Sequence, residues 1–169
     1  MVVILMGVSG SGKTTIGQLL ARHLGWRFYD GDDFHPPANV DKMRQGIALA
    51  DAERDPWLAA LQRLIRDLIR EGQSAVIACS ALKQSYRDRL QGDSQEVRFV
   101  FLKADYDFIR KRIERRQGHF MKANLLASQF DALEEPEGVL VVDAAQPPGA
   151  IVDVIKRELG LSQEANHDD

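Results

Sequence analysis

The stretch Gly7–Thr15, GVSGSGKTT, constrains the fold of this chain more than any other. It fits the pattern G-x-x-x-x-G-K-[ST], in which a glycine-rich loop joins a strand to the start of a helix. The apolar run before it, Val2–Met6, is typical of a buried strand, and Ile16, Leu19 and Leu20 follow at helical spacing. The chain is therefore expected to have an α/β fold.

Such a loop binds phosphate through its backbone. Glycines let it curl so that successive N–H groups point at phosphate oxygens, and the following helix adds its positive dipole end. Lys13 is expected to reach the β and γ phosphates of a nucleoside triphosphate, and Thr14 to offer its hydroxyl to Mg²⁺. A glycine-rich turn without a ligand is the alternative. The predicted nucleotide-binding residues are Gly7, Val8, Ser9, Gly10, Ser11, Gly12, Lys13, Thr14 and Thr15.

Apolar runs alternate with amphipathic stretches along the rest of the chain. Short runs of the kind found in parallel sheets covered on both faces recur at Arg27–Tyr29, Ala75–Cys79, Val97–Leu102 and Val139–Val142. Helical periodicity fills the intervals, most clearly in a helix expected to start at Trp57. The alternation predicts a five-stranded parallel sheet flanked by helices.

Two segments break this alternation. Residues 33–56 carry prolines and mixed charge and are too long for a plain connection, so we interpret them as an inserted substrate-binding region. Residues 117–133 are interpreted as a lid, of which 117–126 would close over bound ligands. With 169 residues in the chain, we expect one domain over residues 1–161, followed by a polar tail at 162–169.

Composition argues against several classes of protein. The net charge is −3, whereas nucleic-acid binders usually carry a basic face, so no nucleic-acid partner is expected. The N-terminal apolar run is too short for a signal peptide or a membrane span, and no membrane partner is expected. The single cysteine, Cys79, excludes an internal disulfide and favours a reducing compartment, so we expect a cytoplasmic protein.

Two aspartates follow the second apolar run in the stretch FYDGDDFHP. Ligands of parallel sheets gather beyond the carboxyl ends of strands, so Asp30 and Asp32 are expected beside the phosphate-binding loop. One carboxylate could hold Mg²⁺ through water, and the other could accept a proton from an attacking hydroxyl. A loop start capped by aspartates is the alternative. His35 would either bind substrate or fill a proline-flanked turn.

Four blocks of the sequence resemble the bacterial-type gluconate kinases, or gluconokinases. They are the phosphate-binding loop (P-loop), DGDDFHPPANVDKMRQGIALADAERDPWL, CSALKQSYRDRL and RQGHFMKANLLASQFDALEEP, and the resemblance covers residues 3–159. These P-loop kinases are related to shikimate and adenylate kinases. The resemblance implies ATP-dependent phosphorylation of D-gluconate to 6-phospho-D-gluconate, usually by a homodimer.

The resemblance also implies roles for individual residues. Asp30 matches the aspartate associated with Mg²⁺, and Asp32 matches the one that orients and deprotonates the substrate hydroxyl. A sugar acid needs a cation for its carboxylate, and either Arg54 or Arg87 is expected in that role. The substrate-binding residues implied are Asp32, His35, Lys42, Arg54, Lys83, Arg87 and His119.

Five basic residues crowd into the seven positions from Arg110 to Arg116. Such runs usually face water, and an RNA contact is the other alternative. Arg112 and Arg116 would share one helix face near the lid. They suit charge stabilisation on a phosphoryl group or stacking over adenine, so Arg112 is predicted to bind nucleotide and Arg116 to act with Lys13 and Asp32 in catalysis.

Two rival functions stay open at the level of sequence. A related small-molecule kinase would act on shikimate, a nucleotide or another sugar acid. A non-catalytic nucleotide-binding switch is the rival from a different class, but it would need no second acidic pair beside a substrate block. The interpretation as a kinase with ATP and Mg²⁺ is therefore favoured.

Overall fold

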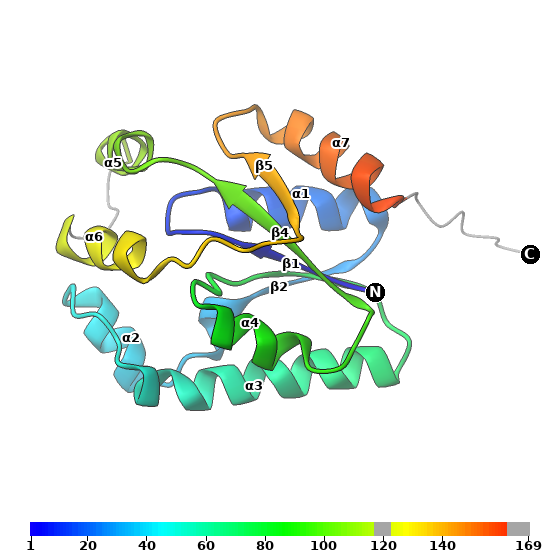
Figure 1. The fold of residues 1–169 in the computed structure, drawn as a ribbon, viewed down its shortest axis with the longest axis horizontal. Helices are drawn as coiled ribbons and strands as arrows, with labels where there is room; N and C mark the ends of the chain where they lie inside the picture. The colour runs from blue at the N-terminus through cyan, green and yellow to red at the C-terminus, as the bar shows by residue number, and fades with distance from the viewer. Residues whose placement is uncertain (117–122, 162–169) are drawn as a thin grey trace, which may run out of the picture.

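The computed structural model describes residues 1–116 and 123–161, so the polar tail and the first part of the predicted lid lie outside the described residues. A central sheet lies between two layers of helices (Figure 1). Its strands are β1 (Val2–Met6), β2 (Arg27–Asp30), β3 (Ala75–Ala78), β4 (Val97–Lys103) and β5 (Leu140–Asp143). The helices are α1 (Lys13–Leu24), α2 (Pro37–Arg44), α3 (Asp51–Arg70), α4 (Gln84–Gln91), α5 (Tyr106–Glu114), α6 (Ala123–Ala132) and α7 (Pro148–Leu159), with a 3₁₀ helix η1 (Gly31–Phe34) after β2.

The strand order is β2-β3-β1-β4-β5, and every neighbouring pair is parallel. The prediction of a five-stranded parallel sheet flanked by helices is therefore confirmed. The register pairs Ile4 of the central strand with Ile77 on one side and Phe99 on the other. In a parallel sheet all carboxyl ends lie at one edge, so the loops after β1, β2 and β3 meet there.

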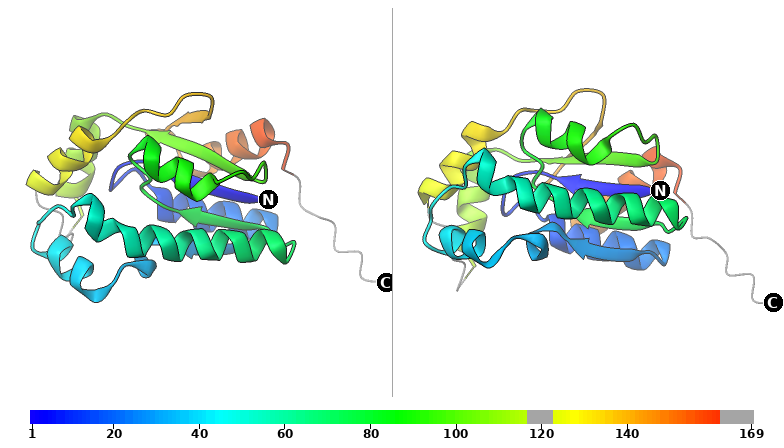
Figure 2. Two further views of the ribbon diagram at one scale, coloured as in Figure 1. Left: turned by 60° about the horizontal axis from the view of Figure 1, so that its bottom comes forward. Right: turned by 90° about the horizontal axis from the view of Figure 1, so that it is seen from below.

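Alternate residues of β1 fill two separate cores. Val2, Ile4 and Met6 pack with residues of α3 and α4, whereas Val3 and Leu5 pack with residues of α1 and α7. All five side chains are completely buried. Figure 2 shows α3 and α4 lying together over one face of the sheet, opposite α1 and α7. Burial on both faces explains why this strand is a continuous apolar run.

Helices α5 and α6 stand beyond the sheet edge at which the strands end (Figure 1). Their buried contacts with the P-loop and with the loop after β3 come from Val8, Leu82, Ile109 and Leu126. This third cluster fixes both helices beside the P-loop. In the described part of the chain, no helix has the length and apolar character needed to cross a membrane.

The expectation that a helix starts at Trp57 is wrong. Helix α3 begins at Asp51, and Pro56 lies inside it. Two acidic residues occupy its first turn, where carboxylates interact favourably with the helix dipole. One of them, Glu53, accepts a hydrogen bond from the backbone N–H of Ala50 at 2.7 Å. These interactions start the helix one and a half turns ahead of the proline.

Gly31 is the point at which three elements meet. A Cβ at this residue would lie 2.6 Å from the carbonyl oxygen of Ala78, so β3 leaves no room for a side chain. The indole Nε1 of Trp57 donates a hydrogen bond to the Gly31 carbonyl oxygen at 2.7 Å. Strand β3, η1 and α3 are thus fixed to one another just beyond the end of β2.

We expect Gly31→Ala to lower the free energy of unfolding by about 1–3 kcal/mol, because the added methyl group would force the backbone apart. Urea denaturation measures this change. The matched control is Gly149→Ala in the first turn of α7, where a Cβ meets nothing within 4 Å. It should leave stability unchanged or raise it by up to about 1 kcal/mol. Equal stability of both variants would contradict the close packing at Gly31.

Candidate active site

The P-loop runs from the end of β1 into α1. Gly12 sits at the N-cap of α1 with φ of 98°, in the left-handed region that favours glycine, and no side chain caps the helix. The free N–H groups of the first turn are therefore available to an anion. Lys13 Nζ donates to the carbonyl oxygens of Gly7 and Val8, both at 2.9 Å. Burial lowers the pKa of Lys13, and the negative charge of Asp32 opposes this effect.

Thr14 and Asp30 lie together, as expected for two metal-binding residues. The Thr14 hydroxyl donates to Asp30 Oδ2 at 3.1 Å, and Asp30 Oδ1 accepts from the backbone N–H of Asp32 at 3.0 Å. The described residues contain no cluster of three or more metal-binding side chains. Mg²⁺ needs no such cluster, because it keeps several waters and takes phosphate oxygens as ligands. The oxygen ligands at Thr14 and Asp30 therefore fit this ion beside a bound nucleotide.

Asp32 faces the same cavity as Lys13. Burial raises the pKa of Asp32, the charge of Lys13 opposes the rise, and the neighbouring carboxylate of Asp30 adds to it. A carboxylate with a raised pKa is a stronger base than one in water. Its position at the carboxyl end of β2 agrees with the expectation from the sequence.

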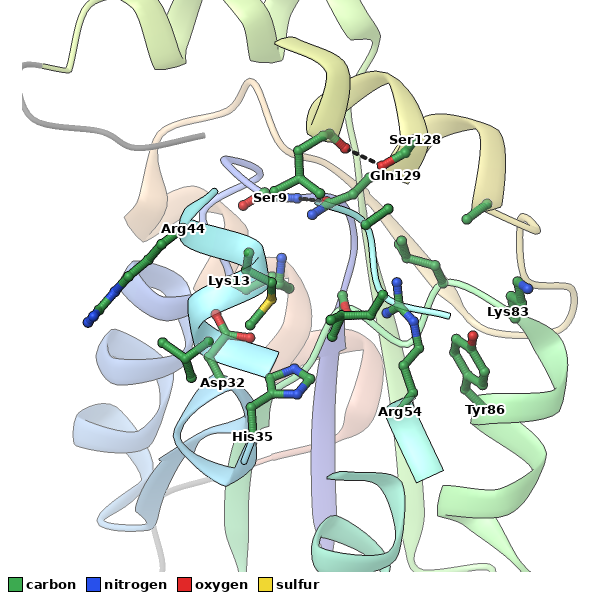
Figure 3. A pocket seen from close by; sticks show the side chains of 18 of the residues that line it. Ser9, Lys13, Asp32, His35, Arg44, Arg54, Lys83, Tyr86, Ser128 and Gln129 are labelled. Carbon is green, nitrogen blue, oxygen red and sulfur yellow. Dashed lines mark hydrogen bonds between the residues drawn. The ribbon is translucent and has the colours of Figure 1, made fainter. Parts of the chain in front are cut away.

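The cavity has a volume of about 1080 Å³ and opens beyond the carboxyl ends of β1, β2 and β3 (Figure 3). It is large enough for a sugar-sized molecule together with part of a nucleotide. The wall opposite the P-loop comes from α2, the start of α3 and the loop after β3, and α6 covers one side. Polar lining residues include Ser9, Lys13, Asp32, His35, Asp51, Arg54, Ser80, Lys83, Arg116 and Gln129.

His35 lies stacked on Trp57, with ring centroids 4.4 Å apart and an interplanar angle of 11°. Asn39 Nδ2 lies 3.4 Å from His35 Nδ1 and donates to the Glu53 carbonyl oxygen at 2.7 Å. Because an amide nitrogen only donates, His35 Nδ1 is the acceptor and Nε2 carries the proton. Burial, with a smaller contribution from Arg54, lowers the pKa of His35 to about 4. The ring is therefore neutral at pH 7 and offers an N–H donor.

Arg54 is one of three cavity arginines, with Arg44 and Arg116, whose side chains make no hydrogen bond or ion pair among the described residues. Lys83 Nζ donates to the Asp51 carboxylate at 3.0 Å, and the Tyr86 hydroxyl donates to the same carboxylate. Arg54 has no such hydrogen bond or ion pair among the described residues, and its guanidinium lies 5.6 Å from the centroid of the Tyr86 ring. Figure 3 shows it pointing into the cavity between His35 and Tyr86. Its charge is thus available for an anionic group of a ligand.

Comparison with known proteins agrees with this site. A family model for shikimate kinase matches residues 9–141. The gluconokinase of Gluconobacter oxydans is 45% identical, with 92% of this chain and 89% of that protein covered. The thermosensitive gluconokinase of Escherichia coli is 52% identical over 79% of this chain and 72% of that protein. The crystal structure of a gluconokinase from Sinorhizobium meliloti is 42% identical, with a TM-score of 0.84 over 94% of this chain and 90% of that one.

The chain belongs to the gluconokinase family. The expected P-loop kinase fold, use of ATP and resemblance to gluconokinases are therefore confirmed. Within this gluconokinase, however, the structure does not bring every predicted substrate-binding residue to the cavity.

The predicted role of Arg87 in substrate binding must be corrected. Its side chain is 3% exposed and lies outside the cavity. The guanidinium donates to the carbonyl oxygens of Ala81, Leu82 and Glu134 at 2.8–3.0 Å and to the Gln84 side chain at 2.9 Å. These four acceptors occupy both terminal nitrogens, and the remaining Nε is buried without a partner, so no accessible edge is left for a substrate carboxylate. Of the two arginines considered for that role, only Arg54 remains.

The predicted role of Lys42 in substrate binding must also be corrected. It does not line the cavity, because its Nζ pairs with the Glu53 carboxylate at the start of α3. This ion pair ties the end of α2 to α3 across the inserted region. His119, which was also predicted to bind substrate, lies outside the residues that the structure describes.

Arg112 and Arg116, the two arginines of the basic run that were assigned roles, lie in different places. Arg116 lines the cavity. Arg112 instead donates through Nη1 to the Gly10 carbonyl oxygen at 3.1 Å and lies 4.7 Å above the centroid of the Phe108 ring. It thus supports the backbone of the P-loop and is not among the residues that line the cavity. The two residues were expected on one helix face near the lid, but α5 ends at Glu114, so Arg116 lies beyond the end of the helix that carries Arg112.

The site residues predicted from the sequence leave out several that line the cavity, among them Asp33, Arg44, Asp51 and Gln129. Asp51 was missed because the proline at position 56 hides the early start of α3. Arg44 extends away from the other labelled side chains (Figure 3). Gln129 accepts a hydrogen bond from the Ser9 backbone N–H at 2.7 Å, across 120 residues of sequence. No local pattern signals a contact of that kind.

The lowered pKa of His35 makes the stability of this gluconokinase depend on pH. Between about pH 6.5 and pH 4 the unfolded chain binds a proton at His35 that the folded chain does not, so acidification over this range favours unfolding. His35→Gln should therefore lose less stability than the wild type between pH 7 and pH 4.5, as measured by urea denaturation. Identical pH profiles of the two proteins would show that His35 ionises normally in the folded state.

Proposed function

We propose that this kinase transfers the γ-phosphoryl group of ATP to a hydroxyl of D-gluconate, giving 6-phospho-D-gluconate and ADP. One juxtaposition carries the proposal: Lys13, Asp32 and the uncommitted Arg54 line a single cavity. These residues supply a cation for phosphate, a base for a hydroxyl and a cation for a carboxylate. The gluconokinases among its relatives support the same acceptor.

In the proposed reaction the acceptor hydroxyl attacks the γ-phosphorus in line with the leaving ADP. The new O–P bond forms as the bond to the bridging oxygen of ADP breaks, and Asp32 takes the hydroxyl proton. The raised pKa of Asp32 suits it to this step. Lys13 neutralises charge on the β and γ oxygens, and Arg116 does so from the cavity side. Arg112 holds the P-loop in place for the nucleotide.

The acceptor would be held by its carboxylate and its hydroxyls. Arg54 binds the carboxylate, and His35 donates its Nε2–H to a hydroxyl. Lys83 and Tyr86, fixed by Asp51, complete the wall beside Arg54. A neutral sugar would leave Arg54 unpaired in the cavity, so the site should discriminate against glucose.

The proposed metal is Mg²⁺, bound by the Thr14 hydroxyl and by Asp30. When bound, this ion would neutralise negative charge on the phosphates. We also propose a homodimer, on the resemblance to gluconokinases. A cytoplasmic location is proposed because the buried thiol of Cys79 is free.

The test is a panel of acceptors. Purified protein with ATP and Mg²⁺ is given D-gluconate, related aldonates, glucose, shikimate or AMP, and ADP release is followed. Gluconate should be preferred over glucose by a wide margin, and AMP should fail. Turnover of shikimate but not gluconate would reject the proposed acceptor and leave the kinase chemistry standing. ATP binding without transfer to any acceptor would favour the nucleotide-binding switch.

Within this panel, Arg54→Met should lower kcat/KM for gluconate roughly 10- to 100-fold, the size of a lost hydrogen bond to a charged group. Its small activity on glucose should change little, because glucose has no carboxylate. Arg63→Met is the charge-matched control, because Arg63 is an exposed arginine of the same helix, α3, and does not line the cavity. A loss on gluconate that is equal in the two variants would show that overall charge matters and not the position of Arg54.

Asp32→Asn should lower kcat by roughly 100-fold or more while ATP binds almost normally, because the amide keeps the shape but cannot accept a proton. Steady-state turnover and nucleotide titration separate these effects. The control, Asp41→Asn, removes an exposed carboxylate of α2 that does not line the cavity and should keep most of the activity. If Asp30→Asn shows the defect in turnover and Asp32→Asn shows a changed Mg²⁺ requirement, the two roles are reversed.

A further inference from the structure

Helix α6 presents one face to the cavity. Leu125, Ser128, Gln129 and Ala132 line it, and their spacing of three and four residues is that of a single helical face. Figure 3 shows Gln129 reaching from this helix to Ser9 of the P-loop, on the same side as Lys13. Gln129 is the polar residue of this face whose side chain contacts the P-loop.

Apolar contacts, and not Gln129, hold α6 in place. Leu126 is 2% exposed and lies in the cluster with Val8 and Ile109. Phe130 packs edge-on against Tyr106 of α5, with ring centroids 5.5 Å apart. Because this packing already anchors the helix, a polar link to the P-loop adds little to its position, and a role in chemistry must be considered.

The contact with Ser9 fixes which end of the Gln129 amide faces the P-loop. A backbone N–H only donates, so the atom 2.7 Å from Ser9 N is the amide oxygen, Oε1. Nε2, with two hydrogens, must then point elsewhere. None of the described residues accepts a hydrogen bond from it. The amide therefore presents a neutral donor to the cavity.

This donor stands between the nucleotide and acceptor parts of the site. Ser9 is the third residue of the P-loop and directly follows Val8, whose carbonyl oxygen binds Lys13 Nζ at 2.9 Å. Ser9, Lys13, Asp32 and Gln129 line the same cavity. A phosphoryl group passing from the P-loop to a hydroxyl at Asp32 would cross this region. Charge then spreads over its equatorial oxygens, where fixed donors stabilise the transition state.

We propose that Gln129 is a further catalytic residue, which donates from Nε2 to an oxygen of the transferring phosphoryl group while its Oε1 stays bound to the Ser9 N–H. This inference rests on the proposed function for its phosphoryl acceptor, but the donor would act with any acceptor alcohol. It also links α6 to the nucleotide through a single side chain.

The decisive variant is Gln129→Glu in the full chain. Glutamate keeps an oxygen for the Ser9 N–H but replaces the donor with a negatively charged oxygen. We expect kcat to fall about 100-fold, as for removal of one donor to a developing oxyanion, with the thermal unfolding midpoint nearly unchanged. ATP affinity should weaken far more than ADP affinity, because only ATP carries the γ-phosphate. Titration with both nucleotides measures this without turnover.

Two further variants complete the set. Gln129→Met removes both the acceptor and the donor without adding charge, and should lower kcat less than Gln129→Glu. Asp131→Asn makes the reverse acid-to-amide exchange at an exposed residue of the same helix and should keep wild-type turnover.

Three outcomes would overturn the proposal. Near-normal turnover of Gln129→Glu, with Gln129→Met losing both activity and stability, would make Gln129 a structural tie only. Tighter ATP binding by Gln129→Met than by the wild type would show that the side chain competes with phosphate for Ser9. An equal loss of ATP and ADP affinity in Gln129→Glu would show that Gln129 does not contact the γ-phosphate. Failure of the proposed function is distinct, since the wild type itself would then release no ADP with gluconate.

Discussion

The complete burial of β1 is the constraint on which the rest of this structure depends. A strand with no exposed side chain needs partners on both edges and cover on both faces, and β3, β4 and two layers of helices supply them. The chain can then leave the strand only at its end, where Gly7 begins the P-loop. The position of the phosphate-binding backbone therefore follows from the position of the core, and the loops after β2 and β3 are brought to the same edge.

Burial at this edge acts on Lys13 and Asp32 in opposite senses. It lowers the pKa of the lysine and raises that of the aspartate, and each charge opposes the effect on the other. The pair is thus held where water screens charge poorly, which strengthens interactions with a phosphoryl group.

The backbone is strained in the loop after β3, at the same edge of the sheet. Ala81 has φ of 44°, and the buried Arg87 donates a hydrogen bond to the carbonyl oxygen of this strained residue.

The sequence predicted the parts of the site that depend on local spacing. The P-loop, the aspartates at the end of β2 and the five-stranded sheet could be predicted because a strand, a turn and a helix each have a short-range pattern. The partners of long side chains could not. Arg87 binds a carbonyl oxygen 47 residues away, and Lys42 pairs with Glu53 after an intervening loop. Both residues were predicted to bind substrate because they lie in blocks of sequence that resemble the family. The sequence of such a block does not reveal which hydrogen-bond acceptor a long cationic side chain contacts in the folded chain. Asp51 was missed because Pro56 suggested a later helix start.

The inserted region has a consequence for how such kinases can diverge. Residues 33–56, interpreted as this region, contain no strand, and they carry α2 and the start of α3 against the part of the cavity proposed to hold the acceptor. The phosphate cradle, in contrast, is built on the central strand. Changes in the insertion can therefore alter the size and charge of the acceptor pocket while the sheet and the P-loop stay as they are. In the proposed site, an evolving or engineered enzyme could therefore alter acceptor choice through this region while keeping the P-loop that serves phosphoryl transfer.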